Sequence, residues 1–271
     1  MIKALSVAGF DGSGGAGITS DTKIFSRFKI LGLSAITAIT AQNPDNVYGV
    51  IPAPADFFDM ELKAVFDYFC VDAVKTGLIA SEEQSLILSE YIKKYMVNIV
   101  VIDPVYISTS NKRLIMKDSN YPDFLMPLFK IATVITPNIK EAEFISGERI
   151  EDLNGMKKAA ESIKERIPAI KNIVIKGSHL NTNLNKDKIY NVLLNSENIF
   201  FVNESERINI DKEIHGTGCA FSAGLTSYLA KGFKIEEALI KTERLVSKFI
   251  KDFRKIPDNN KDKHIYITGN I

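Results

Sequence analysis

Short apolar runs rich in β-branched residues alternate along the chain with longer amphipathic stretches. This alternation is typical of helices that cross over the faces of a mostly parallel sheet. The short runs predict strands at 3–8, 34–40, 72–76, 98–103, 132–136 and 171–176. The longer stretches predict helices at 16–28, 55–69, 82–95, 138–146 and 152–166. Because the strands are apolar almost throughout, we expect helices on both faces of the sheet.

The pattern changes after Lys176. Two extended runs at 187–194 and 198–203 flank a short polar segment and predict a hairpin. Helical patterns return at 217–231 and 235–253. The chain has no internal repeat and no linker rich in Pro, Gly or Ser, so its 271 residues are predicted to form a single domain.

Charge and composition narrow the classes of partner. The chain has 34 Lys and Arg against 33 Asp and Glu, so its net charge of +1 does not favour nucleic acid or an anionic membrane surface. No segment approaches the roughly 18 apolar residues of a membrane span, and the start does not resemble a signal peptide. The two cysteines, Cys70 and Cys219, lack metal-ligand spacing and suit a reduced, cytoplasmic protein. We therefore expect a cytoplasmic protein whose partner is a small molecule.

Polar or glycine-rich residues follow each predicted strand. Ligands of open parallel sheets bind at the carboxyl ends of the strands, so these residues should converge along one edge. They lie at 9–17, 42–43, 76–77, 103–104, 136–138 and 176–177.

The first glycine-rich loop, 9–17, contains a formal G-x-G-x-x-G at 12–17. A dinucleotide site would also need an acid about 20 residues later to hold the ribose, where this chain has Thr-Ala-Gln-Asn at 40–43. No Gly-Lys-Ser/Thr occurs, which excludes a Walker P-loop. A flexible turn is the simplest alternative, but glycines on both sides of Asp11 favour a ligand that approaches the backbone closely.

The second glycine-rich loop, 216–224, opens a helical run of small residues. Successive backbone N–H groups at a helix start suit an anion such as a phosphate in transfer. Cys219 at this position is expected to have a lowered pKa and to accept a proton from a substrate hydroxyl. The alternative is that Cys219 is a small packing residue.

Asn138 and Glu141 are three residues apart, on one face of the first turn of a predicted helix. They could hold the hydration shell of Mg²⁺. They also match a capping box, which stabilises a helix by about 1 kcal/mol. The two roles are compatible.

Seven motifs follow one another along the chain, at 8–18, 40–43, 75–77, 101–105, 135–142, 176–179 and 215–219. In this order they resemble the ribokinase-like superfamily, in particular the hydroxymethylpyrimidine/phosphomethylpyrimidine kinases of thiamin biosynthesis and the related pyridoxine-type kinases. The similarity extends from Ala4 to about Lys251. The resemblance implies a three-layer α/β/α kinase with a mostly parallel central sheet, which uses ATP and Mg²⁺ and forms a homodimer.

The resemblance also implies roles for individual residues. Those expected to bind the pyrimidine substrate, hydroxymethylpyrimidine or its phosphate, are Gly9, Asp11, Ala16, Asp21, Gln42, Leu78 and Val105. Gln42 can pair a donor and an acceptor with an aminopyrimidine edge. Those expected to bind ATP phosphates are Asn138, Lys176 and Thr217, and those expected to organise the cation are Asp103 and Glu141. The catalytic group comprises Gly216, Thr217, Gly218 and Cys219, with Cys219 as the base.

Some positions depart from the family pattern, namely Phe10, Leu78 and 106–110. They affect substrate fit more than phosphoryl transfer. Two rival functions stay open: a pyridoxine or pyridoxal kinase, and a binding protein without catalysis. The joint presence of Asp103, Glu141, Lys176 and Cys219 counts against a mere binder. We expect the segment 105–120 to close over the substrate, because it is rich in Ser, Thr and Asn.

Overall fold

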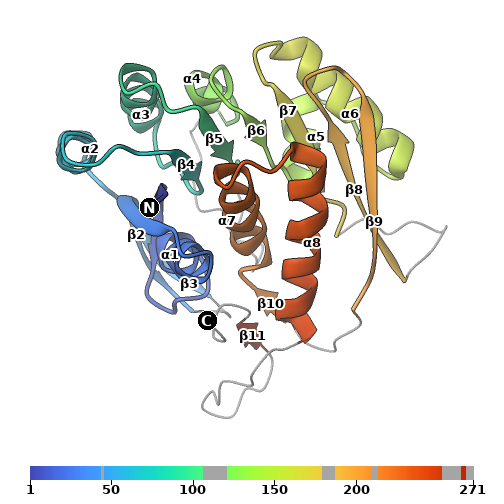
Figure 1. Ribbon diagram of the computed structural model, residues 1–271, viewed down its shortest axis with the longest axis horizontal. Coiled ribbons are helices and arrows are strands. Elements are labelled where there is room, and N and C mark those ends of the chain that lie inside the picture. The colour runs from blue at the N-terminus through green and yellow to red at the C-terminus, as the bar shows by residue number, and fades with distance from the viewer. Residues whose placement is uncertain (44–45, 106–120, 179–186, 209–212, 252–263, 267–271) are drawn as a thin grey trace.

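A single sheet forms the centre of the computed structural model, which describes residues 1–43, 46–105, 121–178, 187–208, 213–251 and 264–266 (Figure 1). Its strand order is β3-β2-β1-β4-β5-β6-β7-β8-β9. The six strands from β2 to β7 in this order are parallel, whereas β3, β8 and β9 are antiparallel to their neighbours. The strands are β1 (Lys3–Asp11), β2 (Leu31–Gln42), β3 (Val47–Pro52), β4 (Ala73–Thr76), β5 (Ile99–Ile102), β6 (Val134–Ile135), β7 (Asn172–Ile175), β8 (Lys188–Leu194) and β9 (Phe200–Glu206).

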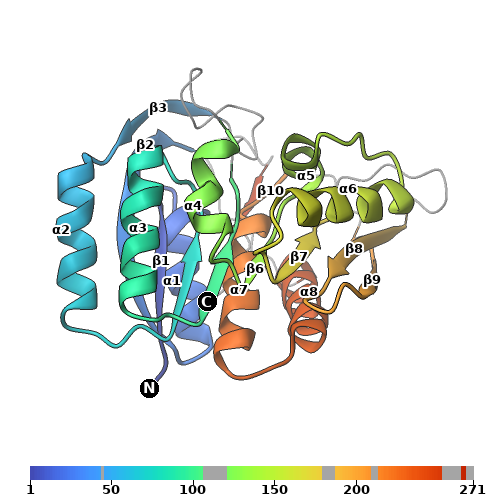
Figure 2. The ribbon, with the colours of Figure 1, turned by 90° about the horizontal axis from the view of Figure 1, so that it is seen from above.

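Helices cover both faces of the sheet, which confirms the three-layer α/β/α prediction (Figure 2). On one face lie α1 (Gly17–Arg27), α7 (Thr217–Ala230) and α8 (Ile235–Lys251). On the other lie α2 (Ala55–Phe66), α3 (Glu82–Lys94), α4 (Met126–Phe129), α5 (Ile139–Ser146) and α6 (Leu153–Arg166). Within the described residues, no helix is both long enough and apolar enough to cross a bilayer.

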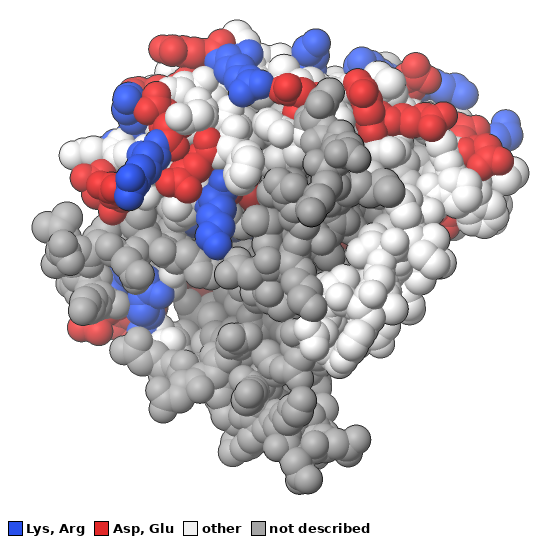
Figure 3. All heavy atoms as spheres, turned by 180° about the vertical axis from the view of Figure 1, so that it is seen from behind, with Lys and Arg blue, Asp and Glu red and all other residues white. Residues whose placement is uncertain are grey.

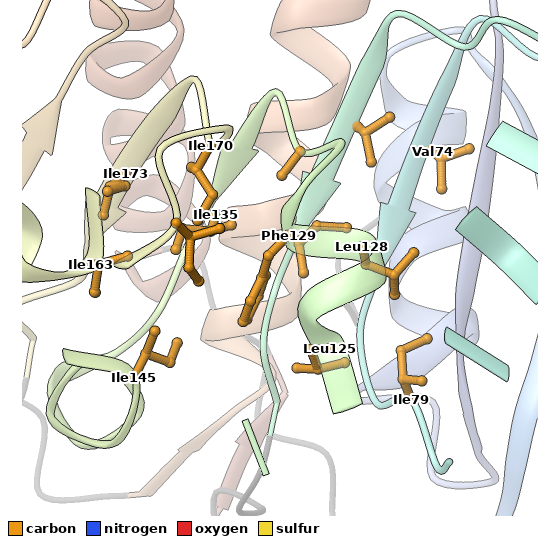
Figure 4. Close-up of a cluster of buried hydrophobic side chains, with 14 of the residues drawn as sticks. Val74, Ile79, Leu125, Leu128, Phe129, Ile135, Ile145, Ile163, Ile170 and Ile173 are labelled. Atoms are coloured by element: carbon orange, nitrogen blue, oxygen red, sulfur yellow. The ribbon is translucent and has the colours of Figure 1, made fainter. Parts of the chain in front are cut away.

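The alternation of side chains along each strand explains the two apolar cores. Val74 and Val100 point to the face covered by α2 to α6, whereas Ala73 and Val101 point to the face of α1, α7 and α8. Both sets are buried, as expected of parallel strands covered on both sides. In Figure 4, Phe129 and Leu128 of α4 fill the space beside the sheet near Ile135 of β6.

Several elements were not predicted from the sequence. The edge strand β3 has only six residues and its side chains are mostly exposed, so its apolar pattern is weak. The 3₁₀ turn η1 (Asp123–Leu125) and α4 are too short to show a helical period. The strands β10 (Glu213–His215) and β11 (His264–Tyr266) pair with each other in a separate two-stranded sheet. Most of the predicted closing segment, 106–120, lies outside the described residues.

Candidate active site

The two glycine-rich loops touch each other at the carboxyl edge of the sheet. Gly216, just before α7, has φ of +89°, and a Cβ atom on it would lie 1.9 Å from the carbonyl oxygen of Gly15. Gly17, at the start of α1, has φ of +59°, and its Cβ would lie 2.1 Å from the carbonyl oxygen of Gly9. Only glycine fits such positions without moving the backbone. The structure therefore brings together the motifs predicted to bind substrate and phosphate.

Asp11 is buried and organises the first loop. Its Oδ1 accepts a hydrogen bond from the Ser13 N–H at 2.8 Å, and its Oδ2 accepts one from the Ala16 N–H at 2.9 Å. Its carbonyl oxygen accepts a further bond from the Gly14 N–H at 3.1 Å. The carboxylate thus holds the loop in shape, while its predicted contact with substrate stays a prediction.

The other residues predicted to bind the pyrimidine lie at or just beyond the carboxyl ends of four adjacent strands, β2, β1, β4 and β5. A Cβ atom on Gly9 would lie 3.4 Å from Cδ2 of Leu78, so these two residues adjoin. Ala16 is the N-cap of α1. Gln42 ends β2 beside a bulge and is half-buried, and Val105 follows β5. These positions are compatible with one pocket, although their roles stay predictions.

Asp21 lies below this surface in a fully buried ion pair. The Nζ of Lys75 lies 2.9 Å from Oδ1 and 2.8 Å from Oδ2 of Asp21, and neither side chain is exposed. The Ser6 hydroxyl donates a 2.5 Å hydrogen bond to the same carboxylate. Ser6 and Lys75 are register partners on β1 and β4, so both side chains point to α1, which carries Asp21. The structure thus places Asp21 in this pair, and its predicted role in substrate binding stays a prediction.

Sequence reasoning assigned no role to Lys75, although the residue stood in a recognised motif. The available signal was a lysine inside a buried strand of four residues. Burial alone lowers the pKa of Lys75, but the charges of Asp21, Cys219 and Asp103 raise it above its ordinary value. Lys75 is therefore a fixed cation beneath the site.

Cys219 has a raised pKa, contrary to the expectation from its position at a helix start. The residue is partly exposed, but burial around the thiol raises its pKa to about 11. Lys75 and a hydrogen bond from the Gly17 amide lower the pKa, whereas Asp21 and Asp103 raise it. Desolvation outweighs the stabilising charges. Cys219 is therefore a neutral thiol at physiological pH.

The start of α7 presents backbone N–H groups to the site. The first bond within the helix runs from the Ala220 N–H to the Gly216 carbonyl at 2.9 Å, so the amides of residues 217–219 precede the helical ladder. A Cβ atom on Gly218 would lie 3.7 Å from Nζ of Lys176. An ammonium group thus stands beside the positive end of the helix, which suits a phosphate.

Lys176 is held by a buried polar cluster. Its Nζ lies 2.8 Å from Oδ1 of Asp103, and Ser222 of α7 donates to Oδ2 of Asp103 at 3.0 Å. Thr136 donates to Oδ1 at 3.3 Å. Burial lowers the pKa of Lys176, but the charges of Asp103, Glu141 and Cys219 reverse this and raise the pKa. The cluster links the ends of β5, β6 and β7 to α7.

Asn138 and Glu141 form the predicted capping box of α5. The Asn138 N–H donates to Oε2 of Glu141 at 2.8 Å, and the Glu141 N–H donates to Oδ1 of Asn138 at 3.0 Å. Asn138 also forms a parallel bridge with Lys176. The cap is therefore confirmed, and it lies next to Lys176, the lysine predicted to bind phosphate.

The donor chemistry near Lys176 fits a magnesium ion that is held mainly by phosphates. Asp103 and Glu141 are buried carboxylates that both act on the pKa of Lys176. The described residues contain no cluster of three or more His, Cys, Asp and Glu side chains that could hold a metal. Magnesium bound with a nucleotide needs only one or two carboxylates, because waters and phosphates complete its shell.

Comparison with known proteins identifies the family. A family model described as phosphomethylpyrimidine kinase matches residues 11–263. This chain belongs to that family. Hydroxymethylpyrimidine/phosphomethylpyrimidine kinase of Aquifex aeolicus (strain VF5) is 35% identical over 254 residues, covering 93% of this chain and 96% of the relative.

Two solved structures extend the comparison for this member of the phosphomethylpyrimidine kinase family. The crystal structure of phosphomethylpyrimidine kinase from Clostridium difficile 630 has a TM-score of 0.76 at 36% identity, covering 92% of this chain and 100% of that one. Pyridoxal kinase from Staphylococcus aureus in complex with ADP has a TM-score of 0.82 at 31% identity, covering 96% and 91%. The backbone alone therefore does not separate pyrimidine kinases from pyridoxal kinases.

Proposed function

We propose that this chain transfers the γ-phosphoryl group of ATP to 4-amino-5-hydroxymethyl-2-methylpyrimidine, to its monophosphate, or to both, in thiamin biosynthesis. The observation that supports this proposal most directly is the contact between Gly15 of the first loop and Gly216 at the start of α7. A pyrimidine held by the first loop would place its hydroxymethyl group beside the helix amides. Membership of the family adds support for this substrate class.

The backbone amides at the start of α7 are the main catalytic element in this proposal. The substrate oxygen bonds to the γ-phosphorus of ATP, the bond from that phosphorus to the bridging oxygen breaks, and ADP leaves. The amides of Thr217, Gly218 and Cys219 stabilise the charge on the transferring group, together with the Lys176 ammonium. Since the pKa of Cys219 is about 11, its thiolate is scarce at neutral pH, and acceptance of the hydroxyl proton is the smaller contribution.

ATP and Mg²⁺ are the second substrate and cofactor of the proposal. The S. aureus structural neighbour was solved with ADP, which supports a nucleotide site in the shared fold. Asn138, Lys176 and Thr217 would contact the phosphates, and Asp103 and Glu141 would hold the cation directly or through water. Magnesium would neutralise phosphate charge.

Pyridoxine or pyridoxal kinase is the second candidate. The similarity to S. aureus pyridoxal kinase favours it, while Gln42 and the sequence relatives favour the pyrimidine. An assay of ADP release with hydroxymethylpyrimidine, its phosphate and pyridoxal in parallel separates the two. If none of the three substrates gave ADP release while the protein still bound ligand, the result would favour a binding protein.

We further propose that the whole chain is one cytoplasmic kinase domain that pairs as a homodimer through β2 and β3. Ile39 and Ile51 face each other across these strands, and they are 55% and 69% exposed. Figure 3 shows a broad uncharged area on the side where β2 and β3 lie. A second copy would cover this apolar face and the edge of β3. Light scattering that gives the mass of a monomer would contradict the dimer.

A further inference from the structure

The residue after Lys176 is fixed by β8. A Cβ atom on Gly177 would lie 1.9 Å from the carbonyl oxygen of Tyr190, so the backbone approaches β8 closely here. The Gly177 N–H donates to Oδ1 of Asn191 at 3.1 Å, and this bond is buried. Asn191 therefore holds the turn that leads away from the phosphate-binding lysine.

Asn191 is itself held by a carboxylate from α8. Its Nδ2 donates to Oε2 of Glu243 at 2.7 Å, and the Ser205 hydroxyl of β9 donates to Oε1 of Glu243 at 3.0 Å. A carboxylate can only accept hydrogen bonds, so it binds the amino end of the Asn191 amide. The carbonyl end must then face the Gly177 N–H. Glu243 thus determines the orientation of the side chain that holds Gly177.

The Glu243 carboxylate is buried at a cost in desolvation free energy. Glu243 is 8% exposed, and burial raises the pKa of its carboxyl group despite the hydrogen bonds from Ser205 and Asn191. An apolar residue at this position would fill the same space without the desolvation cost. Glu243 also lines a cavity of about 360 Å³ between β9 and α8. A carboxylate here is best explained by the hydrogen bonds that it accepts.

We propose that Glu243 is a positioning residue for the phosphate site, acting through Asn191 and Gly177 on Lys176. The inference rests on the proposed function, in which Lys176 meets the phosphates of ATP. Lys176 has a second anchor, because its N–H donates to the Pro137 carbonyl at 2.9 Å. Asn191 fixes the peptide group between Lys176 and Gly177. It thereby directs the Lys176 side chain toward Asp103. Loss of Glu243 weakens nucleotide binding and leaves the pyrimidine pocket intact.

The chain offers a matched control at the other end of the same interface. Asn195 at the end of β8 donates from Nδ2 to Oε1 of Glu236, near the start of α8, at 2.9 Å. This pair also joins β8 to α8 by an Asn–Glu hydrogen bond. It lies near the start of β7, at the opposite end of that strand from Lys176. Its removal tests the effect of loosening α8 alone.

The test compares Glu243→Met, Glu243→Gln and Glu236→Met. Glutamine can still accept from Asn191 and can donate to the Ser205 hydroxyl. For Glu243→Met we expect KM for ATP and Kd for ADP to rise about tenfold, while KM for the pyrimidine stays within about twofold. Glu243→Gln should restore both values to near wild type, and Glu236→Met should leave them unchanged. Equal nucleotide affinities in Glu243→Met and Glu236→Met would overturn the proposal.

Two further measurements keep the test decisive. If Glu243→Met does not fold by circular dichroism, Asn191→Val removes the acceptor for the Gly177 N–H while favouring a strand. An unchanged Kd for ADP in that variant would overturn the proposal. ADP titration needs no turnover, so it also separates this inference from the proposed function. A wild-type protein that binds ADP but phosphorylates no substrate would refute the function only, whereas a failure to bind ADP would refute both.

Discussion

Lys75 and Asp21 form an ion pair with no exposure to solvent, with Nζ within 2.9 Å of both carboxylate oxygens. Two charges in a protein interior are costly to desolvate, and an apolar pair of similar size often stabilises a fold as well. The pair lies beneath Cys219, and both partners act on the pKa of its thiol. We therefore regard the pair as a buried charged group that tunes the pKa of Cys219 from below.

Removal of one partner should be far more harmful than removal of both. Lys75→Met leaves the Asp21 carboxylate buried without its cation and should cost about 3–5 kcal/mol of unfolding free energy. The double variant Lys75→Met/Asp21→Asn should recover most of this loss, because asparagine can still accept from Ser6. Urea unfolding of the two single variants and the double variant gives the coupling energy. Additive losses would show that the pair is not coupled.

The Cys219 thiol should titrate far above an ordinary thiol value of about 8.5. In a Cys70→Ser background Cys219 is the single cysteine, so its alkylation by iodoacetamide reports one group. Because only the thiolate reacts, the rate should keep rising through pH 10, toward a pKa of about 11. In the wild-type protein, Lys75 lowers the pKa of the thiol more than Asp21 raises it. In the Cys70→Ser background, Lys75→Met/Asp21→Asn should therefore raise the pKa of Cys219 further and slow its alkylation at a given pH. A rate that levels off near pH 8 would contradict the burial of the thiol.

The contact between the two loops should be essential for turnover. Gly216→Ala places a methyl group against the Gly15 carbonyl and should lower kcat by about 100-fold or more by displacing the α7 amides. Gly232→Ala is the matched control, because Gly232 has φ of +86° but no atom within 4 Å of the added Cβ. Both variants carry the same backbone strain, of about 1–2 kcal/mol. Equal kcat values in the two variants would exclude a role for the contact.

Cys219 should matter less than the amides around it. Cys219→Ala keeps the backbone N–H groups and removes only the thiol. We expect kcat to fall by about 10- to 100-fold, at or below the low end of general-base effects, because the thiolate is scarce at neutral pH. Full turnover with saturating substrates would refute the assignment of Cys219 as base and leave the amide assignment standing.

The layers of the fold could be predicted from the sequence because its strands and longer helices carry clear apolar periods. β3 escaped prediction because an exposed edge strand lacks such a period, and the β10–β11 pair joins segments about 50 residues apart. The glycine motifs indicated where the site lies, but their contact depends on tertiary packing. The raised pKa of Cys219 could not be foreseen, because the helix start predicts the opposite direction and burial decides the outcome. The hydrogen bonds from Gly177 to Asn191 and from Asn191 to Glu243 likewise join residues 14 and 52 positions apart, which no local pattern reveals.

The most direct test of the central claim is the product formed from ATP, Mg²⁺ and each candidate substrate, identified by mass spectrometry. The account predicts phosphorylated hydroxymethylpyrimidine, with a higher kcat/KM for the pyrimidine or its monophosphate than for pyridoxal, and loss of product in Gly216→Ala. Accumulation of pyridoxal phosphate without any phosphorylated pyrimidine would contradict it.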